Sequence, residues 1–157
     1  MTVSMKPCNI LGLEGFDGGS HRAVRESITR HSRHHWTWLT RPGRAWKWRM
    51  RTGAVELLDR AKQQGVFERR IDRVFCTSMV NAADVRAMLP ARRRDIPIVL
   101  YMHENQAAYP AGHEHTHSAD WDAQFALTNL TSVLAADLVI WNSQWNRDSF
   151  IAAIQDL

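Results

Sequence analysis

Apolar residues along this chain occur in short runs that alternate with amphipathic stretches. Short runs rich in branched and aromatic residues predict strands, and apolar positions repeated every three or four residues predict helices. Strands are expected over residues 8–14, 35–40, 71–77, 96–102 and 137–141. Helices are expected over residues 20–30, 52–64, 81–89 and 120–135, and from 143 to the end of the sequence.

Residues typical of helix ends stand at the predicted boundaries. Ser20, Asn81 and Ser143 each precede a helical stretch. Their side-chain oxygens can accept hydrogen bonds from the backbone N–H groups of a first turn. Gly65 and Pro90 each follow a predicted helical stretch. Glycine and proline are common just after the end of a helix.

Strands that alternate with helices predict an α/β fold with a doubly wound parallel sheet, because right-handed crossovers place helices on both of its faces. We assume the common strand order 3-2-1-4-5, which makes the first and fourth strands neighbours. Ligands of such sheets bind at the carboxyl ends of the strands. The segments 15–21, 103–106 and 142–143 follow strands one, four and five, so we expect them to meet in one crevice.

Composition narrows the class of protein. With 157 residues, 45% of them hydrophobic and 23% charged, the sequence fits a single globular domain over 1–157. No segment approaches the roughly 20 apolar residues of a membrane span, so we expect no membrane partner. Cys8 and Cys76 stand in apolar, strand-like contexts. Buried reduced thiols are usual there, so we expect a cytoplasmic location and no disulfide.

Two polar motifs carry candidate ligand chemistry. In GFDGGSH, residues 15–21, paired glycines let backbone N–H groups approach an anion or a sugar, although a plain tight turn is the alternative. In HENQ, residues 103–106, an imidazole and a carboxylate are followed by two amides suited to hydroxyl-rich ligands. The alternative for HENQ is a histidine whose hydrogen bonds are satisfied within the fold at the end of a strand.

Basic and aromatic residues alternate in residues 41–51, and the chain carries a net charge of +4. Such a segment can neutralise phosphates and stack on bases, whereas the alternative places its tryptophans in the core. The candidate nucleic-acid contacts are Arg44, Trp46, Lys47, Trp48, Arg49 and Arg51. Histidines also alternate over 113–117, but no cysteine or second cluster completes a tetrahedral set, so we expect a solvated loop and no metal.

Taken together, the motifs GFDGGSH, WKWRMRTGA, LYMHENQAAYP and LVIWNSQWNRDSF, in this order, resemble the N-terminal domain of the tRNA-queuosine α-mannosyltransferase family. The resemblance implies the Rossmann-like N-terminal half of a GT-B glycosyltransferase, in which two such domains face each other across a cleft. It implies retaining transfer of mannose from GDP-mannose to queuosine in the anticodon of tRNA(Asp), without a further cofactor.

The resemblance also assigns roles to residues of this sequence. Gly18 and Gly19 would line the cleft between the domains, and His103 and Asn105 would lie near the transferred sugar, with His103 positioning it and stabilising charge. The catalytic candidates are His103, Glu104 and Asn105. The substrate-binding candidates are Gly18, Gly19, Ser20, His21, Gln106, Tyr109, Asn142 and Ser143.

The sequence departs from the family in two respects. A histidine-rich insert occupies residues 113–117, and nothing in the 157 residues supplies the C-terminal domain that binds the nucleotide sugar. We therefore expect this chain alone to transfer no sugar. A stand-alone RNA-binding module is the alternative function. A small-molecule sensor or hydrolase is disfavoured because no G-x-S-x-G motif occurs.

Overall fold

A computed structural model describes residues 6–108 and 119–155 of the chain. In this part, five strands form one sheet: β1 (Asn9–Asp17), β2 (His35–Pro42), β3 (Arg73–Thr77), β4 (Ile98–Met102) and β5 (Leu138–Trp141). The α-helices are α1 (Gly19–His31), α2 (Trp46–Gln63), α3 (Ala82–Met88), α4 (Ala119–Ala135) and α5 (Gln144–Ile154). Short 3-10 helices span Val66–Glu68 and Ala91–Arg93.

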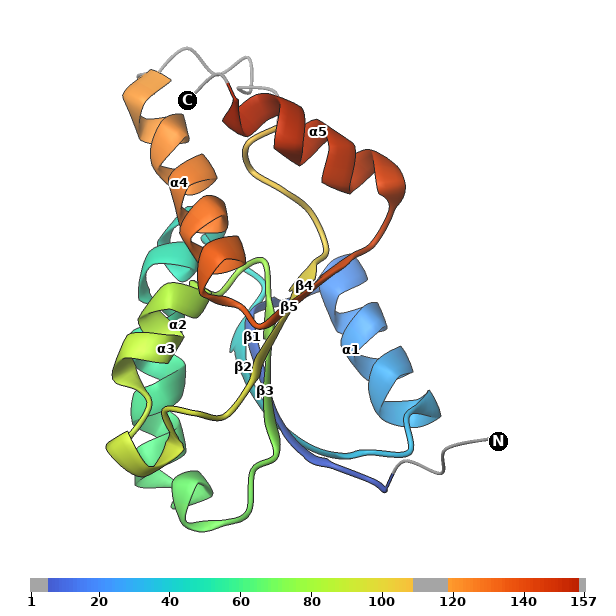
Figure 1. The fold of residues 1–157 in the computed structure, drawn as a ribbon, viewed down its shortest axis with the longest axis vertical. Helices are drawn as coiled ribbons and strands as arrows, with labels where there is room; N and C mark the ends of the chain where they lie inside the picture. Colours follow the sequence, from blue (N-terminus) through green and yellow to red (C-terminus); the bar gives the residue numbers. More distant parts are fainter. Residues whose placement is uncertain (1–5, 109–118, 156–157) are drawn as a thin grey trace.

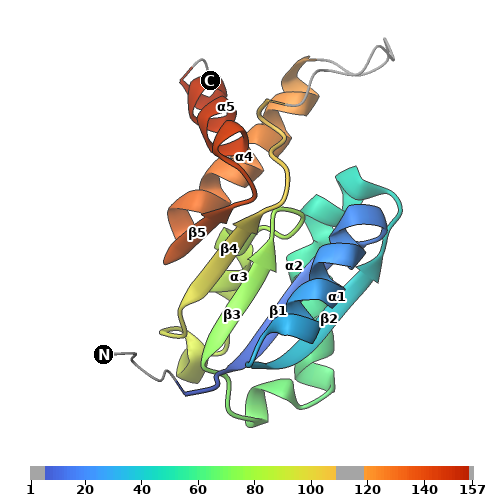
Figure 2. The ribbon, with the colours of Figure 1, turned by 90° about the vertical axis from the view of Figure 1, so that its right-hand side faces the viewer.

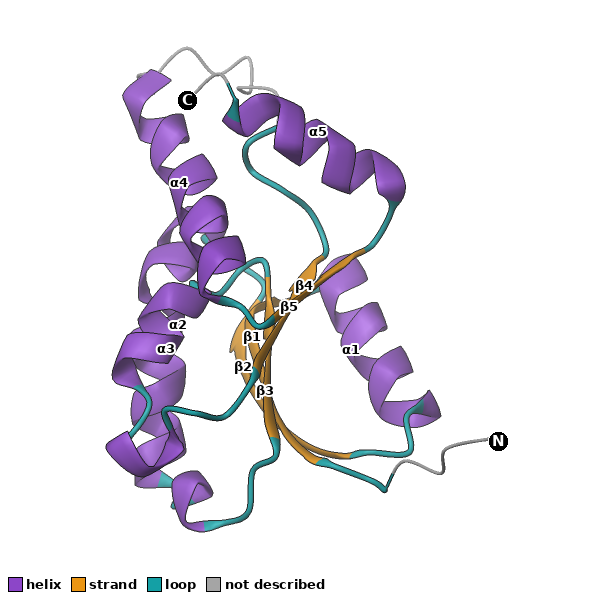
Figure 3. Cartoon of the chain, in the orientation of Figure 1, coloured by secondary structure: helices purple, strands orange, loops and turns teal. Residues whose placement is uncertain are grey.

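The sheet is parallel throughout, with strand order β2-β1-β3-β4-β5. Helices α2, α3 and α4 cover one face, and α1 covers the other (Figures 1 and 3). The predicted α/β class and doubly wound, Rossmann-like sheet are therefore confirmed. The predicted order 3-2-1-4-5 is wrong, because the connection through α2 carries the chain past β1 and places β3 on its free edge. The winding direction thus reverses between β1 and β3.

Apolar residues in register across the central strands build the core. Leu11 of β1 pairs with Val74 of β3, which pairs with Ile98 of β4. All three are fully buried, as expected for parallel strands covered by helices. This face of the sheet packs against α2 and α3, where Leu57 and Val85 are also buried.

Tryptophans of the edge strand β2 fill the opposite face of the sheet. Trp36 and Trp38 stack with their rings 4.9 Å apart, and both contact the edge of Phe75 on β3. Gly12 of β1 makes room for them, since a Cβ atom there would lie 2.3 Å from the ring of Trp38. Edge-to-face and stacked contacts of this kind favour aromatic pairs beyond simple burial.

Helix boundaries confirm some predictions and correct others. Asn81 and Ser143 cap α3 and α5 by accepting hydrogen bonds from backbone N–H groups, as predicted. The cap of α1 is Gly18 rather than Ser20, so Ser20 lies in the first turn. Helix α2 begins at Trp46 rather than near residue 52, so part of the basic and aromatic segment is helical.

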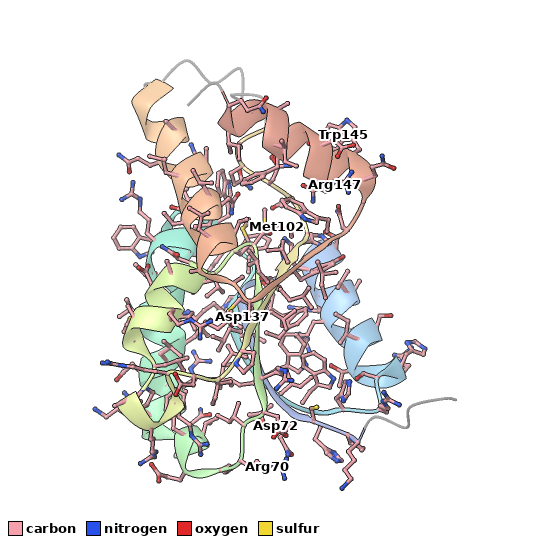
Figure 4. All side chains as sticks on the ribbon, in the orientation of Figure 1. Arg70, Asp72, Met102, Asp137, Trp145 and Arg147 are labelled. Carbon is pink, nitrogen blue, oxygen red and sulfur yellow. The ribbon has the colours of Figure 1, made fainter. Side chains whose placement is uncertain are left out.

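The amino ends of the strands are tied together by two aspartates. Asp72 accepts a hydrogen bond from the backbone N–H of Asn9, and Asp137 accepts one from that of Ile98. The same aspartates pair with Arg70 and Arg86. Figure 4 shows Asp72 and Met102 at opposite ends of the sheet. The polar side chains at the amino end therefore hold the strands, and the carboxyl end carries the candidate ligand chemistry.

Among the described helices, none has both the length and the apolar character that crossing a membrane requires.

Candidate functional site

A buried carboxylate lies at the carboxyl half of β1. Glu14 is only 1% exposed. Its oxygens accept hydrogen bonds from the backbone N–H of Phe16 at 2.8 Å and from the hydroxyl of Thr77 at 3.1 Å, and one lies 3.2 Å from Nδ1 of His21. A buried carboxylate is stable only with such partners. Sequence analysis missed Glu14, although a single acidic residue closing the apolar run 10–14 was a usable signal.

His21, on the first turn of α1, lies between two carboxylates. Its Nδ1 contacts Glu14, and its Nε2 lies 3.6 Å from Oε1 of Glu104. The second distance exceeds a hydrogen bond and describes an ion pair. Burial lowers the pKa of His21, but its interactions with Glu104 and Glu14 outweigh burial and raise the pKa to about 9. His21 is therefore an imidazolium at neutral pH. Its side-chain contact with Glu104, and to a smaller extent its charge, lower the pKa of Glu104.

His103 lies against His21, with ring centroids 4.2 Å apart. Its Nε2 is 2.9 Å from the hydroxyl of Ser20, and the amide of Asn142 donates a hydrogen bond to its backbone carbonyl. Burial, followed by the charge of His21, lowers the pKa of His103. Neighbouring imidazoles thus hold different protonation states at neutral pH, one charged and one neutral.

Asparagines fix the turn that presents these groups. The amide of Asn105 donates to Oδ1 of Asn146 at 2.6 Å, and its oxygen accepts from the backbone N–H of Ala108 at 2.8 Å. Asn146 donates in turn to the carbonyl of Met102 and to Oδ1 of Asn142. Both Asn105 and Asn146 are buried. Sequence analysis assigned Asn105 to catalysis, and the structure gives its amide a network of bonds within the fold.

The next residue, Gln106, is half-buried, and its backbone N–H donates to Asn129 of α4 at 2.8 Å.

A cavity of about 240 Å³ opens beside this cluster. Its lining includes His103, Glu104, Asn142, Ser143 and Trp145. Trp145 is 72% exposed and lies near the start of α5. Figure 2 shows α5 beyond the carboxyl end of the sheet, and Figure 4 labels Trp145 and Met102, the last residue of β4, on this side of the molecule. Sequence analysis did not single out Trp145, since one aromatic residue in a helix usually packs inward.

The two glycines after β1 satisfy steric demands of the turn. A Cβ atom on Gly18 would lie 3.1 Å from Cα of Gly43 in the turn after β2. Gly19 has a φ of 51°, in the left-handed region that favours glycine. These contacts fit the tight-turn interpretation, and an anion or sugar contact at Gly18 and Gly19 stays a prediction.

The basic and aromatic segment divides into inward and outward residues. Arg49 is 8% exposed and pairs with Glu56 at 3.2 Å, and Trp46 packs on Phe125 with ring centroids 5.2 Å apart. Trp48 is exposed on α2. The remaining cations of the predicted interface are Arg44 and Arg51, which are exposed, and Lys47, which lies over the ring of Trp46.

Two predictions fall on residues outside the described ranges. Tyr109 was assigned to substrate binding, and the histidines over 113–117 were expected to hold no metal. Both stay predictions.

Sequence similarity to known proteins identifies the family of the chain. The family model for the tRNA-queuosine alpha-mannosyltransferase N-terminal domain matches residues 9–157. The chain belongs to this family. It is 31% identical over 148 residues to the tRNA-queuosine alpha-mannosyltransferase of Drosophila melanogaster, an alignment that covers 94% of this chain and 37% of the fly protein. No solved structure matches the chain.

Membership of the tRNA-queuosine alpha-mannosyltransferase family confirms the resemblance on which the sequence analysis rested. The matched region contains the described residues of the cluster, from Glu14 on β1 to Trp145 on α5.

Proposed function

We propose that this chain forms the acceptor-side domain of a retaining GT-B mannosyltransferase that modifies queuosine in tRNA(Asp) with mannose from GDP-mannose. The observation that carries the proposal is the family match over residues 9–157. A cluster of ionisable groups at the carboxyl edge of a doubly wound sheet, the usual ligand position of this fold, supports it. We propose residues 1–157 as one domain of a larger enzyme.

The cluster suits a transfer without a dedicated base. In retaining transfer the leaving phosphate can take the acceptor proton, so the protein mainly positions groups and stabilises charge. Neutral His103 and anionic Glu104 can hydrogen-bond to sugar hydroxyls, while the charged His21 holds Glu104 in place through their ion pair. Asn105 and Asn142 then act by holding the turn that carries His103.

We propose that tRNA contacts the surface formed by Arg44, Trp48 and Arg51, all of which are exposed. Arg49 and Trp46 support this surface from inside the fold. The nucleotide diphosphate would bind mainly to the second domain of the GT-B architecture. We propose the cytoplasm as the compartment, in keeping with the free thiols of Cys8 and Cys76.

The test is a chimaera in which this chain replaces the matching segment of the Drosophila relative. The chimaera is incubated with radiolabelled GDP-mannose and either queuosine-containing tRNA or tRNA lacking queuosine. Label in the first tRNA alone is the expected result. A folded chimaera that labels neither tRNA contradicts the proposal, and binding of tRNA without transfer favours the RNA-binding module.

A further inference from the structure

The exposed indole of Trp145 is unusual for its position. Trp141, four residues earlier, is half-buried and packs on Phe150 with ring centroids 5.3 Å apart. Phe150 therefore joins α5 to the end of β5, whereas Trp145 stands in solvent at the rim of the 240 Å³ cavity. A large aromatic side chain exposed beside a cavity is a typical feature of a binding surface.

Hydrogen bonds join several of the polar residues that line the cavity. Asn142 accepts hydrogen bonds from Asn146 and Ser143, and Asn105 bonds to Asn146 and Ser149. The side-chain amides of Asn105, Asn142 and Asn146 thus hydrogen-bond to one another, which fixes their positions in the wall of the cavity. Lining residues held by such hydrogen bonds need little reorganisation when a ligand binds.

Among the described residues that line the cavity, Glu104 is the one that carries a charge, and its side chain is 33% exposed. Its acceptor oxygens suit the two O–H groups of a vicinal diol. Its negative charge disfavours phosphate at the same place. The indole face of Trp145 suits the C–H face of a ring, and His103 adds a second polar group at the cavity wall.

We propose that this cavity binds a ring bearing adjacent hydroxyl groups, with the indole of Trp145 stacked on the ring and the carboxylate of Glu104 accepting hydrogen bonds from the hydroxyls. The inference rests on the proposed function, which supplies two sources of such a ring. One is the transferred mannose, and the other is the dihydroxylated ring of queuosine. The cavity would thereby select the substrate by its hydroxylated ring.

The experiment is an NMR titration of the ¹⁵N-labelled chain, followed through the indole N–H signal that is lost in Trp145→Phe. Methyl α-mannopyranoside tests the donor source. Queuosine nucleoside, compared with guanosine, tests the acceptor source. Trp145→Ala is compared with Leu134→Ala, because Leu134 is similarly exposed, at 76%, on α4. Glu104→Gln tests the carboxylate.

We expect saturable binding of at least one hydroxylated ring, weakened about tenfold by Trp145→Ala and unchanged by Leu134→Ala. Trp145→Phe should retain part of the affinity, and Glu104→Gln should weaken binding with the fold intact by circular dichroism. Binding of the mannoside but not of queuosine assigns the cavity to the donor sugar, and the reverse assigns it to the acceptor.

If neither the mannoside nor queuosine binds, the inference is overturned. Because guanosine and queuosine share the ribose and only queuosine carries the second dihydroxylated ring, equal binding of the two nucleosides without mannoside binding also overturns it. So does affinity that Trp145→Ala leaves unchanged. The binding experiment and the transfer assay on the chimaera can fail independently. The chimaera can transfer mannose even if this cavity binds no sugar, and the cavity can bind a sugar even if the chimaera transfers none.

Discussion

The ion cluster at Glu14, His21 and Glu104 predicts a specific dependence of stability on pH. The pKa of His21 is raised from 6.5 to about 9 in the folded chain. A histidine with a raised pKa stabilises the fold fully below its unfolded value, and this stabilisation is lost as the pH rises through the folded value. The free energy of unfolding should therefore fall between about pH 6.5 and pH 9.

The size of this fall follows from the same two pKa values. A difference of about 2.5 pH units, from 6.5 to about 9, corresponds to about 3 kcal/mol at most. Glu14→Gln removes one of the two carboxylates that favour the imidazolium, while its amide oxygen can still accept from Phe16 and Thr77. The substitution should lower the pKa of His21 and reduce the fall by about half or more.

Urea denaturation at pH 6, 7.5 and 9.5 measures this effect, with Glu26→Gln as the control. Glu26 is an exposed acid on the same helix as His21, paired only with Arg25 among the described residues. The control should keep the pH dependence of the unmodified chain. A free energy of unfolding that is flat over this range, or a slope that Glu14→Gln leaves unchanged, would refute the assignment of an imidazolium at His21.

Three further predictions concern partners and activity. Arg44→Ala combined with Arg51→Ala should weaken tRNA binding and reduce the slope of log affinity against log salt concentration by up to about two, whereas Arg30→Ala on α1 should change neither. If the double variant and the unmodified chain bind tRNA equally well by filter binding, this surface is not part of the RNA interface. The 157-residue chain alone should transfer no mannose from GDP-mannose, so label in tRNA with this chain alone would contradict the two-domain account. The histidines over 113–117 should retain no zinc after dialysis against a mild chelator, and stoichiometric zinc by elemental analysis would show that a site exists there.

Local sequence patterns predicted the elements well because each depends on neighbouring residues. The positions of the strands and the caps at Asn81 and Ser143 were recovered in this way. The strand order was not predicted correctly. The alternation of strands and helices along the chain is the same whether β3 lies beside β2 at the edge of the sheet or beside β1 in its interior. The loops after β1 and β4 still meet, because the carboxyl ends of parallel strands share one edge of the sheet.

The missed residues depend on contacts that the sequence does not contain. Glu14 is paired through Thr77, which is distant in sequence and adjacent in the sheet. The early start of α2 follows from burial of Arg49 and Met50, which local composition did not indicate because arginine is usually exposed. The exposure of Trp145 is set by the position of α5 at the end of β5, a tertiary property.

The most direct test of the central claim is the rate of mannosyl transfer by the chimaera with the Drosophila relative when Glu104 is replaced. Glu104→Gln keeps the shape of the side chain and removes the charge that pairs with His21 and borders the cavity. We predict a loss of kcat/KM for queuosine-containing tRNA of about a hundredfold or more, with Glu26→Gln unchanged. Equal kcat/KM for Glu104→Gln and the unmodified chimaera would contradict a role for this cluster in the transfer.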